Sequence, residues 1–259
     1  MNARRGLGYG AKFMRLLLLG TAGYHPNEKR DTACLMFPEL GLIFDAGTSM
    51  FRVRDHLQTA TLDIFLTHAH LDHIVGLTFL LDVLYENPME AVRVHGEPHK
   101  LEAIQTHLFS EHLFPVPPPY IAVPLESEVR LSDGGVIQHF PLEHPGGSVG
   151  YRIDWPDRSM AYVTDTTAAP DAPYVDIIRG VDLLVHECNF PDGMESLALI
   201  TGHSCTTPVA QVAAAAGVGR LVLVHVNPLS KEDDPVGLSI ARRVFPATEL
   251  GFDQMEIEF

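Results

Sequence analysis

The sequence predicts an α/β protein in which two β-sheets pack between helices, built as one domain over residues 1–259. Short aliphatic and β-branched runs alternate with helical stretches along the whole chain, and no low-complexity linker separates the two halves. Of the 259 residues, 46% are hydrophobic, which is enough for a sizeable core without disulfides. Each half repeats an order of strands followed by helices, which favours one layered unit.

In the first half, apolar runs at 16–19, 42–44 and 62–66 predict strands, and a helix is expected from Asp72 to Tyr85. The segment 88–124 contains "HLFPVPPPYIAVP", which is rich in proline and aromatic residues. Long irregular connections inside a domain are often functional. We therefore expect its middle to be an excursion from the core that acts as a lid or an oligomer contact, with a homodimer as one form.

In the second half, the runs 148–155 and 159–165 flank "PDR" and predict a hairpin. The apolar runs 181–187 and 220–226 predict buried strands, and "MEIEF" at 255–259 predicts the last strand.

Two helices are expected between and after those strands. The first follows Thr207, which we expect at the N-cap because Pro208 suits the first helical position, and glycines end this helix. The second is expected over 234–245.

The N-terminal run Leu16 to Leu19 is shorter than the roughly 7–15 apolar residues of a secretory leader, so "MRLLLLG" is expected to be a core strand. Residues 1–13 are expected to form a loose extension, and no segment approaches the roughly 20 apolar residues of a membrane span. Three cysteines without a paired spacing, Cys34, Cys188 and Cys205, predict small buried side chains in a reducing, cytoplasmic compartment.

The formal net charge is −15, and no run of Lys or Arg is present, so long nucleic acid is not an expected partner. Bound divalent cations would offset part of this charge. The 14 histidines are many for this length.

The stretch "THAHLDH" places His68, His70, Asp72 and His73 directly after an apolar strand. Side chains alternate in an extended segment, so His68 and His70 point the same way and can hold one ion. The turn into the following helix lets Asp72 and His73 point at a neighbouring ion. Imidazole and carboxylate ligands suit Zn²⁺, which takes about four ligands per ion; manganese and iron are alternatives.

More ligands are expected at other strand ends. His144 in "PLEHPGG", Asp165 in "AYVTDTT" and His225 in "LVLVHVNP" each follow or end an extended run. His225, in the most apolar strand, is either a metal ligand or a buried core residue with its hydrogen bonds formed. The presence of the other six candidate ligands favours a metal ligand.

Taken in this order, these motifs resemble the metallo-β-lactamase superfamily, over almost the whole chain. The resemblance implies an αββα four-layer sandwich with its site at the edges of the two sheets. It also implies that His68, His70 and His144 bind one metal and that Asp72, His73 and His225 bind the second, with Asp165 as the bridge.

The stretch "GHSCTTPVAQ" is similar to the tRNase Z-like phosphodiesterase branch of that superfamily. The matching residues are Gly202, His203 and Ser204, with Cys205 in place of a threonine. "VHECNF" supplies Glu187 as the acidic partner of His203. The alternative is that Glu187 is a surface carboxylate and His203 a loop residue.

The long arm that binds tRNA in tRNase Z has no counterpart here, because a single hairpin separates His144 from Asp165. The shorter layout is more similar to the cyclic-phosphate phosphodiesterase of phosphonate breakdown, although the cysteine-rich zinc site of that enzyme type is missing.

The resemblance implies a dinuclear metal phosphodiesterase that cleaves a small cyclic or nucleotide-like phosphodiester by a metal-bridging hydroxide. Asp72 would orient the hydroxide, His203 held by Glu187 would protonate the leaving oxygen, and "GGSVGY" (146–151) would either line the phosphate or turn into the next strand. Hydrolysis of a carboxylic ester, thioester or lactam is the alternative, and tRNA 3′ processing is a further one.

Overall fold

Two mixed β-sheets face each other in the centre of the structure, a computed structural model that describes residues 14–259. The expected extension at residues 1–13 lies outside the described residues. The first sheet runs in the order β14-β1-β2-β3-β4-β5-β6, with β1 (Arg15–Gly20), β2 (Cys34–Phe37), β3 (Leu42–Phe44), β4 (Thr61–Phe65), β5 (Ala91–Gly96), β6 (Ile121–Pro124) and β14 (Met255–Glu258). The second sheet runs in the order β13-β12-β11-β10-β9-β8-β7, with β7 (Glu128–Arg130), β8 (Val136–Leu142), β9 (Ser148–Asp154), β10 (Ser159–Val163), β11 (Leu183–Glu187), β12 (Arg220–Val224) and β13 (Thr248–Leu250).

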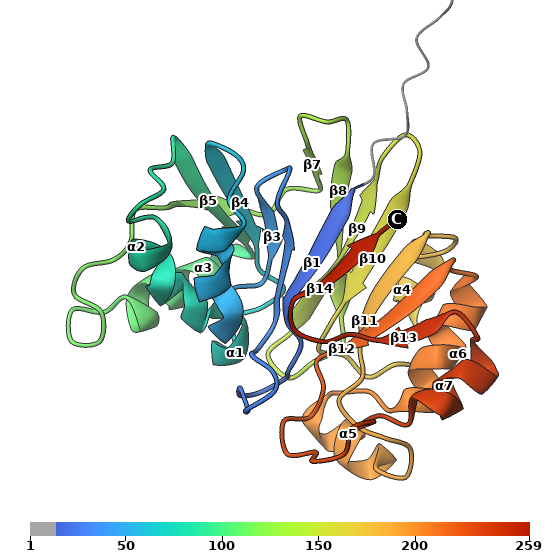
Figure 1. The fold of residues 1–259 in the computed structure, drawn as a ribbon. Helices are drawn as coiled ribbons and strands as arrows, with labels where there is room; N and C mark the ends of the chain where they lie inside the picture. Colours follow the sequence, from blue (N-terminus) through green and yellow to red (C-terminus); the bar gives the residue numbers. More distant parts are fainter. Residues whose placement is uncertain (1–13) are drawn as a thin grey trace, which may run out of the picture.

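Helices cover the outer face of each sheet, so the expected αββα sandwich is confirmed (Figure 1). The first sheet is covered by α1 (Leu71–Ile74), α2 (Leu80–Val83), α3 (Pro98–Ala103), the 3₁₀ helices η1 (Thr48–Asp55) and η2 (Val75–Phe79) and the π-helical turn η3 (Ile104–Leu108). The second sheet is covered by α4 (Pro173–Ile177), α6 (Thr206–Ala216) and α7 (Leu238–Val244), and α5 (Glu195–Thr201) lies beyond the end of that sheet (Figure 1).

The uninterrupted apolar strands are explained by burial on both faces. In β1, Leu16 and Leu18 point into the core between the sheets, whereas Leu17 and Leu19 pack under the helices of the first sheet. Because side chains alternate along a strand, such a position requires apolar residues at every step. The predicted strands are therefore present, and the predicted hairpin is the antiparallel pair β9 and β10.

The prediction of one helix from Asp72 to Tyr85 is wrong in its continuity. The helical segment starts at Leu71 and is divided into α1, η2 and α2. The cause is the loop at Ala46, which forms two hydrogen bonds with backbone groups of the helical segment. Gly76 N donates to Ala46 O at 2.7 Å, and His73 O accepts from Ala46 N at 2.7 Å. Gly76 permits this approach, since a Cβ there would lie 2.2 Å from Gly47 O.

The expected excursion within 88–124 holds only for the proline-rich part, where residues 111–117 are almost all exposed, and its role as a lid or oligomer contact stays a prediction. Both ends of the segment are strands of the first sheet, β5 and β6, which run parallel to each other. Its middle forms α3 and η3, whose Leu101 and Ile104, followed by Phe109, are buried in the core under the first sheet. The segment is thus the crossover that two parallel strands need, and its proline-rich loop leads from η3 to β6.

The prediction placed the N-cap of α6 two residues too late. The helix begins at Thr206 with Cys205 at the N-cap, and no side chain of the cap residue bonds to the helix. Asp192, from the loop between β11 and α5, does so in its place, because its carboxylate accepts from Thr207 N at 2.8 Å and from the Thr207 hydroxyl. Similarly, α7 starts at Leu238 and not at residue 234. The carboxylate of Asp234 accepts hydrogen bonds from the backbone N–H groups of Gly237 and Leu238 and so precedes the helix.

The three cysteines are buried and unpaired, as predicted. Within residues 14–259, none of the helices has the length and apolar character needed to cross a membrane.

Candidate metal centre

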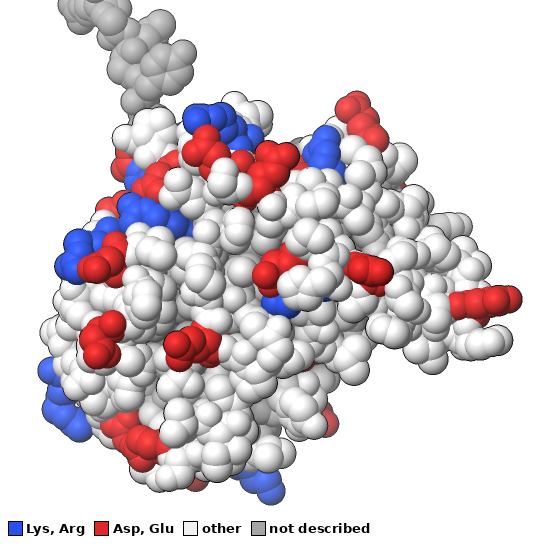
Figure 2. All heavy atoms as spheres, turned by 180° about the vertical axis from the view of Figure 1, so that it is seen from behind, with Lys and Arg blue, Asp and Glu red and all other residues white. Residues whose placement is uncertain are grey.

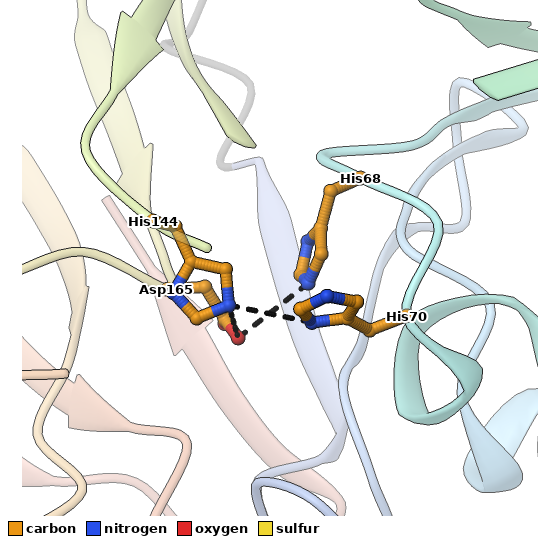
Figure 3. Close-up of side chains that lie close together, drawn as sticks. All are labelled: His68, His70, His144 and Asp165. Carbon is orange, nitrogen blue, oxygen red and sulfur yellow. Dashed lines mark hydrogen bonds and ion pairs between the residues drawn. The ribbon is translucent and has the colours of Figure 1, made fainter. Parts of the chain in front are cut away.

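The seven predicted ligand residues come together where strands of both sheets end. His68 and His70 follow β4, Asp72 and His73 lie in α1, and His144, Asp165 and His225 follow β8, β10 and β12. The carboxyl ends of parallel strands gather at one edge of a sheet, and ligand sites are common there. The two sheets bring their edges face to face, so that His68 and His70 point at His144 and Asp165 from the opposite side (Figure 3).

The first ligand group consists of His68, His70, His144 and Asp165, whose donor atoms lie within 4.8 Å of one another. Oδ2 of Asp165 lies 3.6 Å from His68 Nε2 and 3.5 Å from His144 Nε2. His144 Nε2 lies 3.3 Å from His70 Nδ1 (Figure 3). Four nitrogen and oxygen donors thus surround one point.

The second ligand group consists of Asp72, His73 and His225. Their donor atoms lie 3.3 to 3.5 Å apart. The other oxygen of Asp165, Oδ1, lies 3.3 Å from His73 Nε2 and 3.2 Å from His225 Nε2. Asp165 therefore presents one oxygen to each group, which is the geometry that a bridging carboxylate requires.

These spacings fit two tetrahedrally held ions. An ion with ligand atoms at about 2.0–2.1 Å places those atoms about 3.3–3.4 Å from one another. The buried Nε2 of His68 has no hydrogen-bond partner, although a buried polar atom without a partner is costly. A metal ion at this position would satisfy it.

The outer ring nitrogens support the same arrangement. His73 Nδ1 donates to Asp45 at 2.8 Å and His144 Nδ1 donates to Gly202 O at 2.9 Å. The Thr67 hydroxyl donates to Asp45, so its oxygen is free to accept from His68 Nδ1 at 3.0 Å. When a histidine donates from Nδ1, its Nε2 keeps a free lone pair for a metal.

Sequence reasoning missed Asp45, although a signal was present. This residue is fully buried and follows the apolar strand β3, as the predicted ligands follow theirs. Its carboxylate accepts from Thr67 N at 2.8 Å and from Tyr162 OH at 3.0 Å, in addition to His73. Asp45 therefore orients the ligand residue His73 through a hydrogen bond and does not itself face the centre.

The backbone at this edge adopts conformations that are uncommon for residues with a side chain. Asp45, Asp165 and His225 all have positive φ, at 59°, 48° and 55°. Such residues cost of order 1–3 kcal/mol each and concentrate at functional sites. Gly23 leaves the space that the His225 ring fills, since a Cβ there would lie 2.3 Å from His225 Cε1.

His203 and Glu187 form the predicted pair beside the two ligand groups. Glu187 is fully buried, and its Oε1 accepts from His203 Nδ1 at 3.0 Å and from Thr166 N at 2.9 Å. Burial lowers the pKa of His203, but the Glu187 carboxylate and then the carboxylates of the centre raise this pKa to about 9. Glu187 therefore favours the protonated imidazole, which lies close to Asp165 and His225. The reading of Glu187 as a surface carboxylate is wrong.

The remaining motif residues have structural roles. Gly202 ends α5 with φ 73°, and a Cβ there would lie 2.3 Å from Pro145. The Ser204 hydroxyl donates to Thr166 O at 2.7 Å, which ties this loop to the end of β10. In "GGSVGY", Gly146 and Gly147 have positive φ and β9 begins at Ser148, so this stretch forms the turn.

A cleft of about 910 Å³ opens over the centre. His70, Asp72, His144 and His203 line it, together with Asn189, whose amide contacts the His225 ring. Its volume is in the range of small-molecule sites.

Comparison with known proteins finds relatives over almost the whole chain. The chain is 29% identical to the ribonuclease Z of Acaryochloris marina (strain MBIC 11017), with 93% of this chain and 96% of that protein covered. The alignment spans 306 positions, more than the 259 residues of this chain, so that relative carries segments which this chain lacks.

Two solved structures share the fold. The metallo-β-lactamase fold protein YhfI of Bacillus subtilis superposes with a TM-score of 0.79 at 19% identity, covering 96% of this chain and 100% of that one. A diphosphatase of the PhnP family has a TM-score of 0.72 at 19% identity, covering 96% and 98%. The beta-lactamase superfamily domain matches residues 42–226. The chain has the fold of a metallo-β-lactamase fold protein and belongs to the beta-lactamase superfamily, and the predicted class of metal-dependent hydrolase is confirmed.

Proposed function

We propose that this protein hydrolyses a small phosphodiester with two divalent metal ions, zinc by preference. The observation that carries the proposal is the shared carboxylate of Asp165 between two groups of donors, next to the pair of His203 and Glu187. His68, His70 and His144 would hold one ion, and Asp72, His73 and His225 the other. Two such ions activate water at neutral pH and offset negative charge on phosphate oxygens.

Three side chains would have the remaining catalytic and positioning roles. His203 would give the proton from Nε2 to the departing oxygen, since its Nδ1 is occupied by Glu187. Glu187 would hold the ring in place and keep it charged. Asp72 is fixed by the backbone N–H of Tyr24 at 2.7 Å, so its carboxylate can keep one orientation toward the attacking water.

Charge and size favour a small substrate over tRNA. The net charge is −15, and on the face seen in Figure 2 the Lys and Arg side chains are scattered among Asp and Glu. Long nucleic acids need a continuous basic surface to bind tightly. The likeness to ribonuclease Z keeps tRNA processing as the second candidate, and the segments missing from this chain weigh against it.

Metal analysis combined with a substrate panel tests this proposal. We expect close to two ions per chain and faster cleavage of bis(4-nitrophenyl) phosphate than of pre-tRNA, carboxylic esters, thioesters or lactams. Full activity in metal-free protein, or accurate and efficient trimming of pre-tRNA, would contradict it.

A further inference from the structure

The cleft above the candidate centre has an unusual rim of large apolar side chains. Tyr24, Leu71, Leu197 and Leu229 line it, and they are 79%, 67%, 42% and 76% exposed. Single exposed apolar residues are common on proteins, but their convergence marks a binding surface. These four come from four separate segments of the chain and meet at one opening.

The chain holds parts of this rim in place. The backbone N–H of Tyr24 donates to Asp72, although Tyr24 itself has a φ of 63° that is uncommon for a tyrosine. Leu197 belongs to α5, whose C-terminal residue leads directly into Gly202 and His203. Leu229 is exposed in a turn in which its backbone N–H donates to the side chain of Asn227, at 2.9 Å. The apolar rim is therefore tied to the residues of the centre itself.

The absence of positively charged side chains from the cleft restricts the kind of ligand that it can bind. Within residues 14–259, no Lys or Arg side chain lines this cleft. A substrate with several phosphates would need such cations, since phosphate oxygens are usually met by Arg, Lys or metal. A single phosphodiester group carries one negative charge, which the metal centre can meet by itself.

We infer that the cleft selects a phosphodiester in which at least one ester group is bulky and apolar, an aromatic ring or an alkyl chain. This inference rests on the proposed function for the position of the phosphate at the centre. The apolar group would lie on the His203 side, between Phe190, Leu197 and Leu229, which line the same cleft. Burial of each methylene contributes about 0.8 kcal/mol, which corresponds to about a fourfold change in affinity.

Binding of dibutyl and dimethyl phosphate to the metal-loaded protein tests this inference without turnover. The two probes have the same charge and are symmetric, so that either ester can enter the cleft. Three added methylenes in the cleft predict that dibutyl phosphate binds roughly 10- to 60-fold more tightly, by calorimetry and by inhibition of bis(4-nitrophenyl) phosphate cleavage. Equal affinity for the two probes would overturn the inference.

A pair of matched variants locates the effect. Leu229→Ser removes an exposed side chain of the cleft, whereas Leu199→Ser removes one that is 70% exposed on α5 but does not line the cleft. We expect the dibutyl-to-dimethyl ratio to fall severalfold in Leu229→Ser and to stay unchanged in Leu199→Ser. Equal ratios in the two variants would contradict the inference.

The outcome separates this inference from the proposed function. If phosphodiesters are cleaved with no preference for apolar esters, the inference fails and the function stands. If dibutyl phosphate binds selectively but no phosphodiester is cleaved, the function fails and the apolar cleft stands.

Discussion

The two ligand groups share Asp165 but are supported differently by the protein around them. In the second group, the outer nitrogen of His73 donates to the carboxylate of Asp45, and the side chains of His73 and His225 are 0% and 1% exposed. In the first group, His68 and His144 donate to a hydroxyl and a backbone carbonyl, and His70 is exposed in the cleft. A carboxylate behind a histidine raises its basicity and fixes its ring. From this difference we expect the second group to hold an ion more tightly, and the first to be more accessible from the cleft through His70.

The largest effect is expected from the residue that belongs to both groups. Asp165→Ala removes an oxygen from each, so we expect metal content to fall at both and activity to reach background. His225→Ala should empty mainly the second group and keep the first. Elemental analysis and zinc titration measure this, and unchanged occupancy of both groups in Asp165→Ala would show that it does not bridge.

The next effect concerns a residue that faces both groups without belonging to either. His203→Ala should keep its metals and lose about 10²–10⁴-fold in rate on alkyl phosphodiesters, the usual contribution of a general acid. An alkoxide needs a proton to leave and nitrophenolate largely does not, so the loss on nitrophenyl esters should be much smaller.

The measurement is the ratio of mutant to parent rate across leaving groups of rising pKa. A flat ratio, or the loss of one metal in His203→Ala, would rule out proton donation by this residue.

A direct test of the comparison is Asp45→Asn. The amide cannot accept all the hydrogen bonds that Thr67, Tyr162 and His73 now donate to the carboxylate. We expect about 10–100-fold weaker metal affinity at the second group, as for other partners of this kind, and less at the first. In competition with a chelator, the parent protein should lose its two ions in sequence. Asp45→Asn should lose them together.

The chain offers a matched control in Asp63→Asn. Asp63 in β4 accepts from His95 Nε2 in β5 at 2.8 Å and so forms another carboxylate–histidine pair, away from the ligand groups. This variant should leave metal affinity unchanged. Equal weakening in the two variants would mean that general stability, and not the support of His73, is responsible.

The smallest expected effect is a shift in pH dependence. The pKa of His203 is about 9, so the imidazole is protonated below that pH, and activity on alkyl esters should fall as pH rises through it. Glu187→Gln removes the charge that raises this pKa, so the decline should move to lower pH. Rate profiles of both proteins measure the shift, and an unmoved alkaline limb would contradict the pairing.

The same pair links stability to pH. A histidine whose pKa is raised by folding stabilises the folded state fully below its unfolded value, about 6.5. That contribution is lost as pH rises toward 9. The free energy of unfolding of Glu187→Gln should therefore differ most from that of the parent below pH 6.5 and least above 9.

Local pattern was enough to predict much of the site. Apolar runs such as 220–224 are buried on both faces, so their period marks strands reliably, and polar ligands directly after them must emerge at a sheet edge. That reasoning placed His68, His70, His144, Asp165 and His225 in one region before any distance was known. The family resemblance added the pairing of His203 with Glu187, which the structure brings within 3.0 Å.

Contacts between distant segments decided the rest. The break of the helix after Asp72 comes from bonds to Ala46, and the start of α6 depends on Asp192, 15 residues before the helix residue that it contacts. Asp45 supports His73 across 28 residues, and Tyr24 and Leu229 line one cleft although they are far apart in the sequence. The periodicity of a segment shows which of its side chains are buried. The support of His73 by Asp45 and the start of α6 depend instead on which distant segment packs against them, and only the folded chain determines this.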